Sequence, residues 1–195
     1  FEKEDSFGRH TSSRNSETVH SGIYYPPGTL KAKLCLAGNE LLYRFMKDNG
    51  ITHKNCGKYI IASSGNEIPE IERLHANGIK NKVPGIRIAE GKEIMMREPI
   101  VNAVAGVYVP TAGIMDSHGI MKRLEYLARE NGVLFAYRTG VKSIEHTGPG
   151  YMVTAGDSHS IVADIVVNCA GLYSDKVAAM AGIDIDSAGY RLHFC

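Results

Sequence analysis

"IVVNCAGLYSDKVAAMAG", residues 165–182, decides the fold because it places an apolar run, a small-residue turn and a helix in that order. The apolar run at 165–167 is typical of a central parallel strand, and the helix is predicted to begin at Ser174 or Asp175. Ligands of open α/β sheets collect where such strands end, because glycine permits close approach and a helix amino terminus favours phosphate. Ala170 and Gly171 stand there, although the same residues can also form an ordinary tight turn.

The residues before this stretch complete an α/β unit. A helix is predicted from Asp116 or Ser117 to 131, ended by Gly132 and carrying a Glu125 to Arg129 pair. Its apolar face consists of Ile120, Leu124, Leu127 and Ala128. "VLFAY" at 133–137 is predicted to be a buried strand, and the Gly-punctuated residues up to 163 a small antiparallel meander. With the strand at 165–167 and a helix at 174–181, these elements indicate one domain.

The first half of the chain is predicted to contain one long helix followed by a mixed α+β unit. Thr29 can cap a long helix that ends at Gly50. Its apolar residues at helical spacing are Leu30, Leu34, Ala37, Leu41 and Phe45, with Lys31, Arg44 and Lys47 outward. Strands are predicted at 57–63, 85–90 and 103–110, a short helix at 92–97, and a polar helix at 67–81 interrupted near Pro69. Residues 51–112 therefore form a mixed, more antiparallel unit, and the chain leaves one domain and returns to it.

Composition excludes several classes of protein. The 195 residues are 44% hydrophobic, enough for a packed core, and the formal charge of +1 argues against nucleic acid as a partner. Four cysteines, Cys35, Cys56, Cys169 and Cys195, show no C-x-x-C spacing, so they are predicted to be buried free thiols rather than metal ligands. No apolar run approaches the ~20 residues of a membrane span, and no signal peptide stands out. A cytoplasmic protein is expected, with at most peripheral membrane association.

Both ends of the chain resemble cuts. It starts at Phe1 without methionine and stops in "YRLHFC", an alternating pattern that resembles the start of a strand. We therefore expect the chain to be a fragment.

Several stretches together resemble one family. "TSSRNS", "HSGIYYPPGTLKAKLC", "GKYIIA", "VPGIRI", "TAGIMDSHG" and "VVNCAGLYSD" are similar, in order, to landmarks of the L-2-hydroxyglutarate dehydrogenase and oxidase family. These flavoenzymes belong to the D-amino-acid-oxidase-like superfamily. The resemblance implies the fold class α/β, with an incomplete FAD/NAD(P)-binding Rossmann-like domain interleaved with a mixed α+β substrate domain. The implied boundaries are 1–50 and 113–187 for the FAD-binding domain, and 51–112 and 188–195 for the substrate domain.

The resemblance implies FAD as cofactor and assigns residues to it. Glu2 matches the acidic residue that hydrogen-bonds the adenosine ribose, the loop at 11–16 matches the segment that wraps the pyrophosphate, and Val141 matches the backbone position at the adenine edge. The implied set is Glu2, Lys3, Thr11, Ser12, Ser13, Arg14, Asn15, Ser16, Val141, Ala170, Gly171 and Leu172. Hydroxyls, amides and an arginine fork suit an anion, although a solvated Ser/Asn turn has the same composition. The glycine-rich G-x-G-x-x-G turn of the family is absent, so the chain alone is expected to be inactive.

The implied reaction is oxidation of a small 2-hydroxy acid, L-2-hydroxyglutarate to 2-oxoglutarate, by hydride transfer to flavin. His20 is the candidate catalytic base because an imidazole titrates near working pH; the open alternative is a structural histidine. Arg14 or Lys58 could bind carboxylate. The resemblance gives the substrate pocket Tyr24, Tyr25, Lys58, Tyr108 and Thr111.

Other readings stay open at this point. A glycerol-3-phosphate dehydrogenase-like enzyme or an amine or amino-acid oxidase would share the FAD residues, and a non-catalytic fragment is a further alternative. The electron acceptor is expected to be oxygen or a quinone, no metal is expected, and a eukaryotic protein would be mitochondrial, peripheral at the inner membrane.

Overall fold

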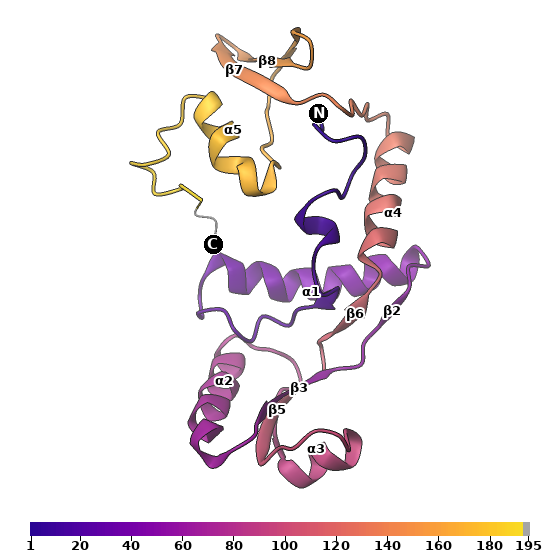
Figure 1. Cartoon of the computed structure of the whole chain (residues 1–195), viewed down its shortest axis with the longest axis vertical. Helices are drawn as coiled ribbons and strands as arrows, with labels where there is room; N and C mark the ends of the chain where they lie inside the picture. Colours follow the sequence, from indigo (N-terminus) through magenta and orange to yellow (C-terminus); the bar gives the residue numbers. More distant parts are fainter. Residues whose placement is uncertain (193–195) are drawn as a thin grey trace. The chain divides into compact units, whose positions relative to one another are not determined.

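The computed structural model describes residues 1–192 and divides into two compact units (Figure 1). Unit 1 consists of Phe1–Arg14 and Leu124–Cys195, and unit 2 is the continuous segment Asn15–Arg123 between them. The domain boundaries implied above stay predictions. The last three residues, including Cys195 and the end of the predicted final strand, lie outside the described residues.

A three-stranded antiparallel sheet forms the centre of unit 2. It contains β3 (Lys58–Ala62), β5 (Ala105–Val109) and β4 (Arg87–Glu90), in the order β3-β5-β4. The register pairs Tyr59 with Tyr108 and Ile60 with Val107. Because side chains alternate between faces, neighbouring residues of β3 serve two different cores. All three strands match the sequence-based prediction.

Helices α2 (Ile68–Lys80) and α3 (Gly91–Arg97) lie on opposite sides of the β3 and β5 pair (Figure 1). Ile71 and Leu74 of α2 pack with Val107 in one core, and Ile94 of α3 packs with Ala89 and Ala103 in another. The 3-10 turn η2 (Gly65–Glu67) precedes α2. The predicted interruption near Pro69 is wrong. Pro69 lies in the first turn of α2, where a backbone N–H has no helical acceptor, so the proline costs the helix no hydrogen bond.

The long helix α1 (Leu30–Asp48) begins and ends as predicted. The Thr29 hydroxyl accepts a hydrogen bond from the Ala32 amide at 3.3 Å, and Gly50 follows the end with φ +64°. Its predicted apolar stripe is largely uncovered, because α1 turns its other side, with Ala32 and Met46, into the protein. The exposed fractions are 70% for Leu30, 62% for Leu34 and 57% for Leu41. Periodicity located the helix correctly without identifying the face that packs.

A second small antiparallel sheet joins distant segments of unit 2. It contains β1 (Thr18–Val19), β6 (Gly113–Met115) and β2 (His53–Lys54), in the order β1-β6-β2. Helix α4 (Ser117–Glu130) follows β6 directly. Its start is capped from afar by Glu17, whose carboxylate accepts from the Ser117 amide at 3.0 Å and the Ser117 hydroxyl at 2.7 Å.

Unit 1 contains the predicted meander. Strands β7 (Val141–Thr147), β8 (Gly150–Ala155) and β9 (His159–Ala163) pair antiparallel in sequence order. The 3-10 turns η1 (Thr11–Ser13) and η3 (Gly171–Tyr173) and helix α5 (Ser174–Met180) complete it. The predicted Glu125 to Arg129 pair is present at 2.6 Å.

Two predicted strands are wrong. Residues 133–137 and 165–167 belong to no strand, and three of their apolar side chains are strongly exposed: 94% for Leu134, 78% for Ile165 and 76% for Val167. A central parallel strand requires ladder partners and two covered faces. The backbone of the first segment bonds to the end of α4, where the Val133 amide donates to the Ala128 carbonyl at 3.0 Å, and to the chain start, where the Glu2 amide donates to the Ala136 carbonyl at 2.9 Å. Both segments therefore have the apolar composition of a strand without forming one.

The cysteine prediction holds in part. Cys35, Cys56 and Cys169 are free, as expected, but the prediction that they are buried is wrong for Cys56 and Cys169, which are exposed, and Cys35 is half-buried. Within residues 1–192, no helix is long and apolar enough to cross a membrane, and no cluster of three metal-ligating side chains occurs.

Candidate functional site

Three side chains of unit 1 lie around the Tyr173 ring, and one of them, Lys3, belongs to the predicted cofactor site. The Lys3 ammonium lies 3.9 Å from the centroid of the Tyr173 ring, and the Lys176 ammonium lies 5.4 Å from it. The His10 ring meets Tyr173 edge-on at 6.2 Å. The chain start, the turn before the loop at 11–14, and the turn after residue 170 therefore meet around one aromatic ring.

Backbone hydrogen bonds hold the chain start in place. Besides the bond to residue 136, the Glu2 carbonyl accepts from the Thr139 amide at 2.8 Å. The Glu2 carboxylate accepts from the Glu4 amide at 2.9 Å and is half-buried. The Glu4 carboxylate in turn lies 2.9 Å from the His10 ring nitrogen. Glu2, the acidic residue predicted to bind ribose, thus has a backbone held by hydrogen bonds on both sides, and its carboxylate is held by the amide of Glu4 two residues later.

The loop at 11–14 folds as a single 3-10 turn. The Arg14 amide donates to the Thr11 carbonyl at 3.1 Å, and the Ser13 amide donates to the His10 carbonyl at 3.1 Å. The Arg14 guanidinium lies 3.4 Å from the Ser13 hydroxyl, which makes this contact long and leaves the cation exposed. Such local bonding is what Ser-rich turns favour.

The loop continues into unit 2 with two further predicted residues. The Asn15 side chain accepts from the Glu17 amide at 2.8 Å, and the Ser16 hydroxyl lies 3.1 Å from that of Thr18. Both side chains thus brace the start of β1. Glu17 itself has φ +54°, a conformation that the Asn15 bond supports.

The turn at 170–172 leaves open space beside its glycine. Gly171 has φ +56°, the left-handed region that favours glycine, and no protein atom lies within 4 Å of where a Cβ would stand. Asn168 braces this turn: its side chain accepts from the Ala170 amide at 3.1 Å and donates to the Ser174 carbonyl at 2.7 Å. Leu172 is 45% exposed. Sequence reasoning missed Asn168, although an asparagine after an apolar run is a turn signal.

Val141 opens β7, as predicted. It pairs with Ala155, and the register shifts between Val141 and Ser143. Such an irregularity changes which backbone groups join the ladder.

His20 and Thr111, two of the predicted residues of unit 2, are brought together by a third residue. The Asn39 side chain donates to the His20 carbonyl and to the Thr111 carbonyl, each at 2.9 Å. The His20 side chain is exposed. Its backbone is therefore anchored while its imidazole faces outward.

Lys58 and Tyr24 form a second pair. The Lys58 ammonium lies 3.5 Å from the Tyr24 hydroxyl and 4.6 Å from the ring centroid. Burial lowers the pKa of Lys58 and raises the pKa of Tyr24. The neighbouring Tyr25 instead stacks under Lys31, whose ammonium lies 4.7 Å from its ring centroid.

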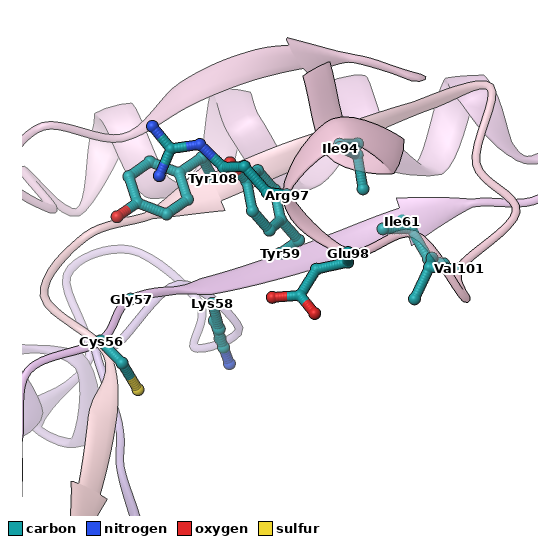
Figure 2. Close-up of a pocket in the computed structure, with 10 residues that line it drawn as sticks. All are labelled: Cys56, Gly57, Lys58, Tyr59, Ile61, Ile94, Arg97, Glu98, Val101 and Tyr108. Carbon is teal, nitrogen blue, oxygen red and sulfur yellow. The ribbon is translucent and has the colours of Figure 1, made fainter. Parts of the chain in front are cut away.

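A pocket of about 580 Å³ opens beside β3 (Figure 2). Its lining consists of Cys56, Gly57, Lys58, Tyr59, Ile61, Ile94, Arg97, Glu98, Val101 and Tyr108. Figure 2 shows Lys58 extending from β3 on the side opposite to the rings of Tyr59 and Tyr108. Those two rings lie 4.9 Å apart, and Arg87 stacks on Tyr108 at 5.1 Å.

The pocket contains part of the predicted substrate set. Lys58 and Tyr108 line it, whereas Tyr24, Tyr25 and Thr111 are outside its lining. Sequence reasoning missed Tyr59 and Arg97. Only the strand register shows that Tyr59 lies opposite Tyr108. Arg97 is a single exposed arginine in a short helix, which carries no signal of its own.

Comparison with known proteins identifies related sequences. A family model described as "FAD dependent oxidoreductase", named DAO, matches residues 1–193. The L-2-hydroxyglutarate dehydrogenases of Arabidopsis thaliana and Homo sapiens, both named mitochondrial, are 37% and 35% identical over 92% and 95% of the chain. The Escherichia coli (strain K12) enzyme of that name is 30% identical over 94%. The chain spans 44%, 42% and 43% of these relatives.

Solved structures share the fold. L-alpha-glycerophosphate oxidase from Mycoplasma pneumoniae, with FAD bound, matches 94% of this chain and 50% of its own, with a TM-score of 0.87 and 27% identity. Glycine oxidase from Geobacillus kaustophilus matches 94% of this chain and 51% of its own, with a TM-score of 0.83 and 19% identity. The fold is thus the α/β fold of these FAD enzymes, as expected from the sequence.

Proposed function

The chain belongs to the DAO family of FAD-dependent oxidoreductases, and on that premise we propose that the whole protein oxidises L-2-hydroxyglutarate to 2-oxoglutarate. The observation that carries the proposal is the shared name of the curated relatives, which match more than nine-tenths of the chain at 30–37% identity. Since the chain spans less than half of each relative, the activity is proposed for the full-length protein.

The described residues of unit 1 fit FAD. Gly171 leaves open space against the backbone, and Lys3 and Arg14 offer cations to a phosphate-bearing molecule. In the proposal, Glu2 binds the ribose, the loop at 11–14 binds the pyrophosphate together with Asn15 and Ser16, and the backbone of Val141 meets the adenine. Lys3 and the turn at 170–172 complete the set.

Lys58 is the proposed carboxylate-binding residue of the substrate site. Lys58 is half-buried and contributes to the lining of a pocket of about 580 Å³, a size that suits a small molecule, while its ammonium extends away from the Tyr59 and Tyr108 rings towards Tyr24. Tyr24 supports the ammonium from one side, and Tyr108 forms part of the wall. A dianionic 2-hydroxy acid gains a charge-assisted hydrogen bond there that a neutral substrate would lack.

His20 is the proposed catalytic base. FAD, when bound, supplies the acceptor for the hydride that leaves C2. The chain's part is to remove the proton of the substrate hydroxyl at the imidazole of His20, which is exposed and has an anchored backbone. The electrons then pass to oxygen or a quinone. If the source is eukaryotic, the proposed location is mitochondrial, which the word "mitochondrial" in the names of the eukaryotic relatives supports; the peripheral inner-membrane position rests on the family resemblance alone.

One rival activity has an observation in its favour. The structural match at 27% identity is a glycerophosphate oxidase, so glycerol 3-phosphate is an alternative substrate. The two activities are separated by mixing purified full-length protein, without oxygen, with L-2-hydroxyglutarate, glycerol 3-phosphate or amino acids. Loss of visible flavin absorbance with L-2-hydroxyglutarate alone supports the proposal. Bleaching by glycerol 3-phosphate alone contradicts it.

A further inference from the structure

Three asparagine side chains hold the segment 20–25 by its carbonyl oxygens. Asn77 of α2 donates to the carbonyls of Ile23 at 2.6 Å and Tyr25 at 2.9 Å. Asn81, directly after α2, donates to the carbonyls of Gly22 at 2.9 Å and Tyr25 at 2.8 Å. Asn39 of α1 donates to the His20 carbonyl, as described above. We call these three residues the asparagine clamp.

The chemistry of the clamp fixes the orientation of each amide. Every partner is a carbonyl oxygen, which only accepts, so the side-chain nitrogen must face it in each case. One NH₂ group has two hydrogens. Asn77 and Asn81 use both on the segment 20–25, and Asn39 uses one on the segment and one on the Thr111 carbonyl. Asn81 is only 6% exposed, which makes its bonds costly to lose.

Packing also anchors this segment, because the Ile23 side chain is 0% exposed and belongs to the core with Ile71, Leu74 and Val107. Gly22 has φ +84°, and a Cβ there would stand 3.4 Å from the Leu36 side chain of α1. The Ser21 hydroxyl is buried and has no hydrogen-bond partner within the described part of the chain. The asparagines bind the segment at its carbonyls, and the Cys35 thiol also lies 3.7 Å from the His20 carbonyl oxygen, while His20 and Tyr24 stay exposed.

Asn39 differs from the other two because it joins two loops. Its second bond goes to the Thr111 carbonyl, in the connection between β5 and β6. Asn55 binds the same connection: with its amide nitrogen turned toward it, it donates to the carbonyls of Pro110 at 2.6 Å and Ala112 at 3.1 Å. Asn39 thus ties His20 to the connection that follows the strand carrying Tyr108.

We propose that Asn39 is a positioning residue that fixes His20 relative to the Thr111 connection and so to the pocket wall. The proposal rests on the proposed function, in which His20 accepts the substrate proton. A base must stand within hydrogen-bond reach of the proton it removes, and displacement by about 1 Å can lower the rate about a hundredfold. An amide that grips the backbone of the base provides this precision without altering the imidazole.

The test compares two leucine variants of the full-length flavoprotein. Asn39→Leu keeps the side-chain size and removes both bonds of the clamp residue. Asn49→Leu is the matched control, because Asn49 lies at the end of the same helix and donates to the Phe45 carbonyl at 2.8 Å while accepting from Arg123 at 2.7 Å. Both variants should lose thermal stability, so stability alone does not distinguish positioning from structure.

Two readouts decide the proposal. Amide hydrogen exchange in the segment 20–25 should rise at least about tenfold in Asn39→Leu and stay unchanged in Asn49→Leu. The rate constant of flavin reduction, per bound flavin and at saturating substrate, should fall roughly tenfold to a hundredfold in Asn39→Leu only. Unchanged exchange overturns the clamp, and faster exchange with a wild-type reduction rate overturns its catalytic part. If the wild type itself is not reduced, the proposed function is contradicted, and the exchange result still decides the clamp.

Discussion

Replacing Lys58 by methionine should separate binding from stability at the proposed substrate pocket. The change keeps the length of the side chain and removes its charge. Burial lowers the pKa of Lys58, so the charged form is less favourable in the folded protein than in the unfolded chain. The unfolded chain therefore holds the Lys58 proton more tightly than the folded protein does. As a result, the free energy of unfolding rises with pH between the lowered pKa of Lys58 and the ordinary lysine pKa. Lys58→Met should therefore leave the melting temperature unchanged or raise it.

The effect on substrate should have the opposite sign. A hydrogen bond to a charged group contributes about 1.5–3 kcal/mol, and partial exposure of Lys58 reduces this to about 1–2 kcal/mol. A loss of that size lowers kcat/KM for L-2-hydroxyglutarate roughly 5-fold to 30-fold. The fall should lie mainly in KM, because the carboxylate is bound equally in the ground state and the transition state.

Lys31→Met is the matched control for this prediction. Its ammonium lies 4.7 Å from the ring of Tyr25, a geometry close to that of Lys58 over Tyr24, but it is exposed and outside the pocket. Steady-state kinetics and thermal unfolding of both variants in the full-length enzyme provide the measurement. An unchanged kcat/KM in Lys58→Met, or a loss that matches a fall in melting temperature, would refute the reasoning.

Other changes test the remaining parts of the account. His20→Gln should keep FAD bound but slow flavin reduction roughly a hundredfold in rapid-mixing experiments; a normal rate in the loaded variant removes His20 from the mechanism. Gly171→Ala and Gly182→Ala both place a side chain at positive φ in open space, so each should lower the free energy of unfolding by about 1 kcal/mol. Only Gly171→Ala should raise the Kd for FAD in a titration. Equal Kd values in the two variants would count against the cofactor turn at 170–172. Hydrogen bonds from Ser117 lower the pKa of Glu17, so the stability it contributes is lost as pH falls through that lowered pKa, and Glu17→Gln should flatten the acid branch of the unfolding curve; an unaltered branch would mean the cap contributes nothing.

Much of the fold was predictable because it depends on local signals. Thr29 and Gly50 mark the ends of α1, and the strands predicted at 57–63, 85–90 and 103–110 contain β3, β4 and β5. The failures have a common physical cause. Residues 133–137 and 165–167 have the composition of buried strands, but a strand exists only when another segment completes its ladder, and that pairing is not encoded locally.

The candidate site shows the same limit. The family resemblance supplied Lys58, Tyr108 and His20 as candidates. The structure adds the contacts of Lys58 with Tyr24 and of Tyr108 with Tyr59. Sequence could not supply Asn39 or Tyr59, because an asparagine in a helix and a tyrosine in a strand acquire a role only through contacts about 20 to 70 residues away. The exposed stripe of α1 is a related case: its spacing is helical, yet the packed side of the helix carries Ala32 and Met46 instead.

Anaerobic mixing of the full-length protein with L-2-hydroxyglutarate tests the central claim most directly. The account predicts that flavin absorbance is lost and that one 2-oxoglutarate forms per flavin reduced, because a hydride carries two electrons, whereas the D enantiomer and glycerol 3-phosphate leave the flavin oxidised. A purified protein that carries FAD and is reduced by glycerol 3-phosphate or an amino acid, but not by L-2-hydroxyglutarate, would contradict the account.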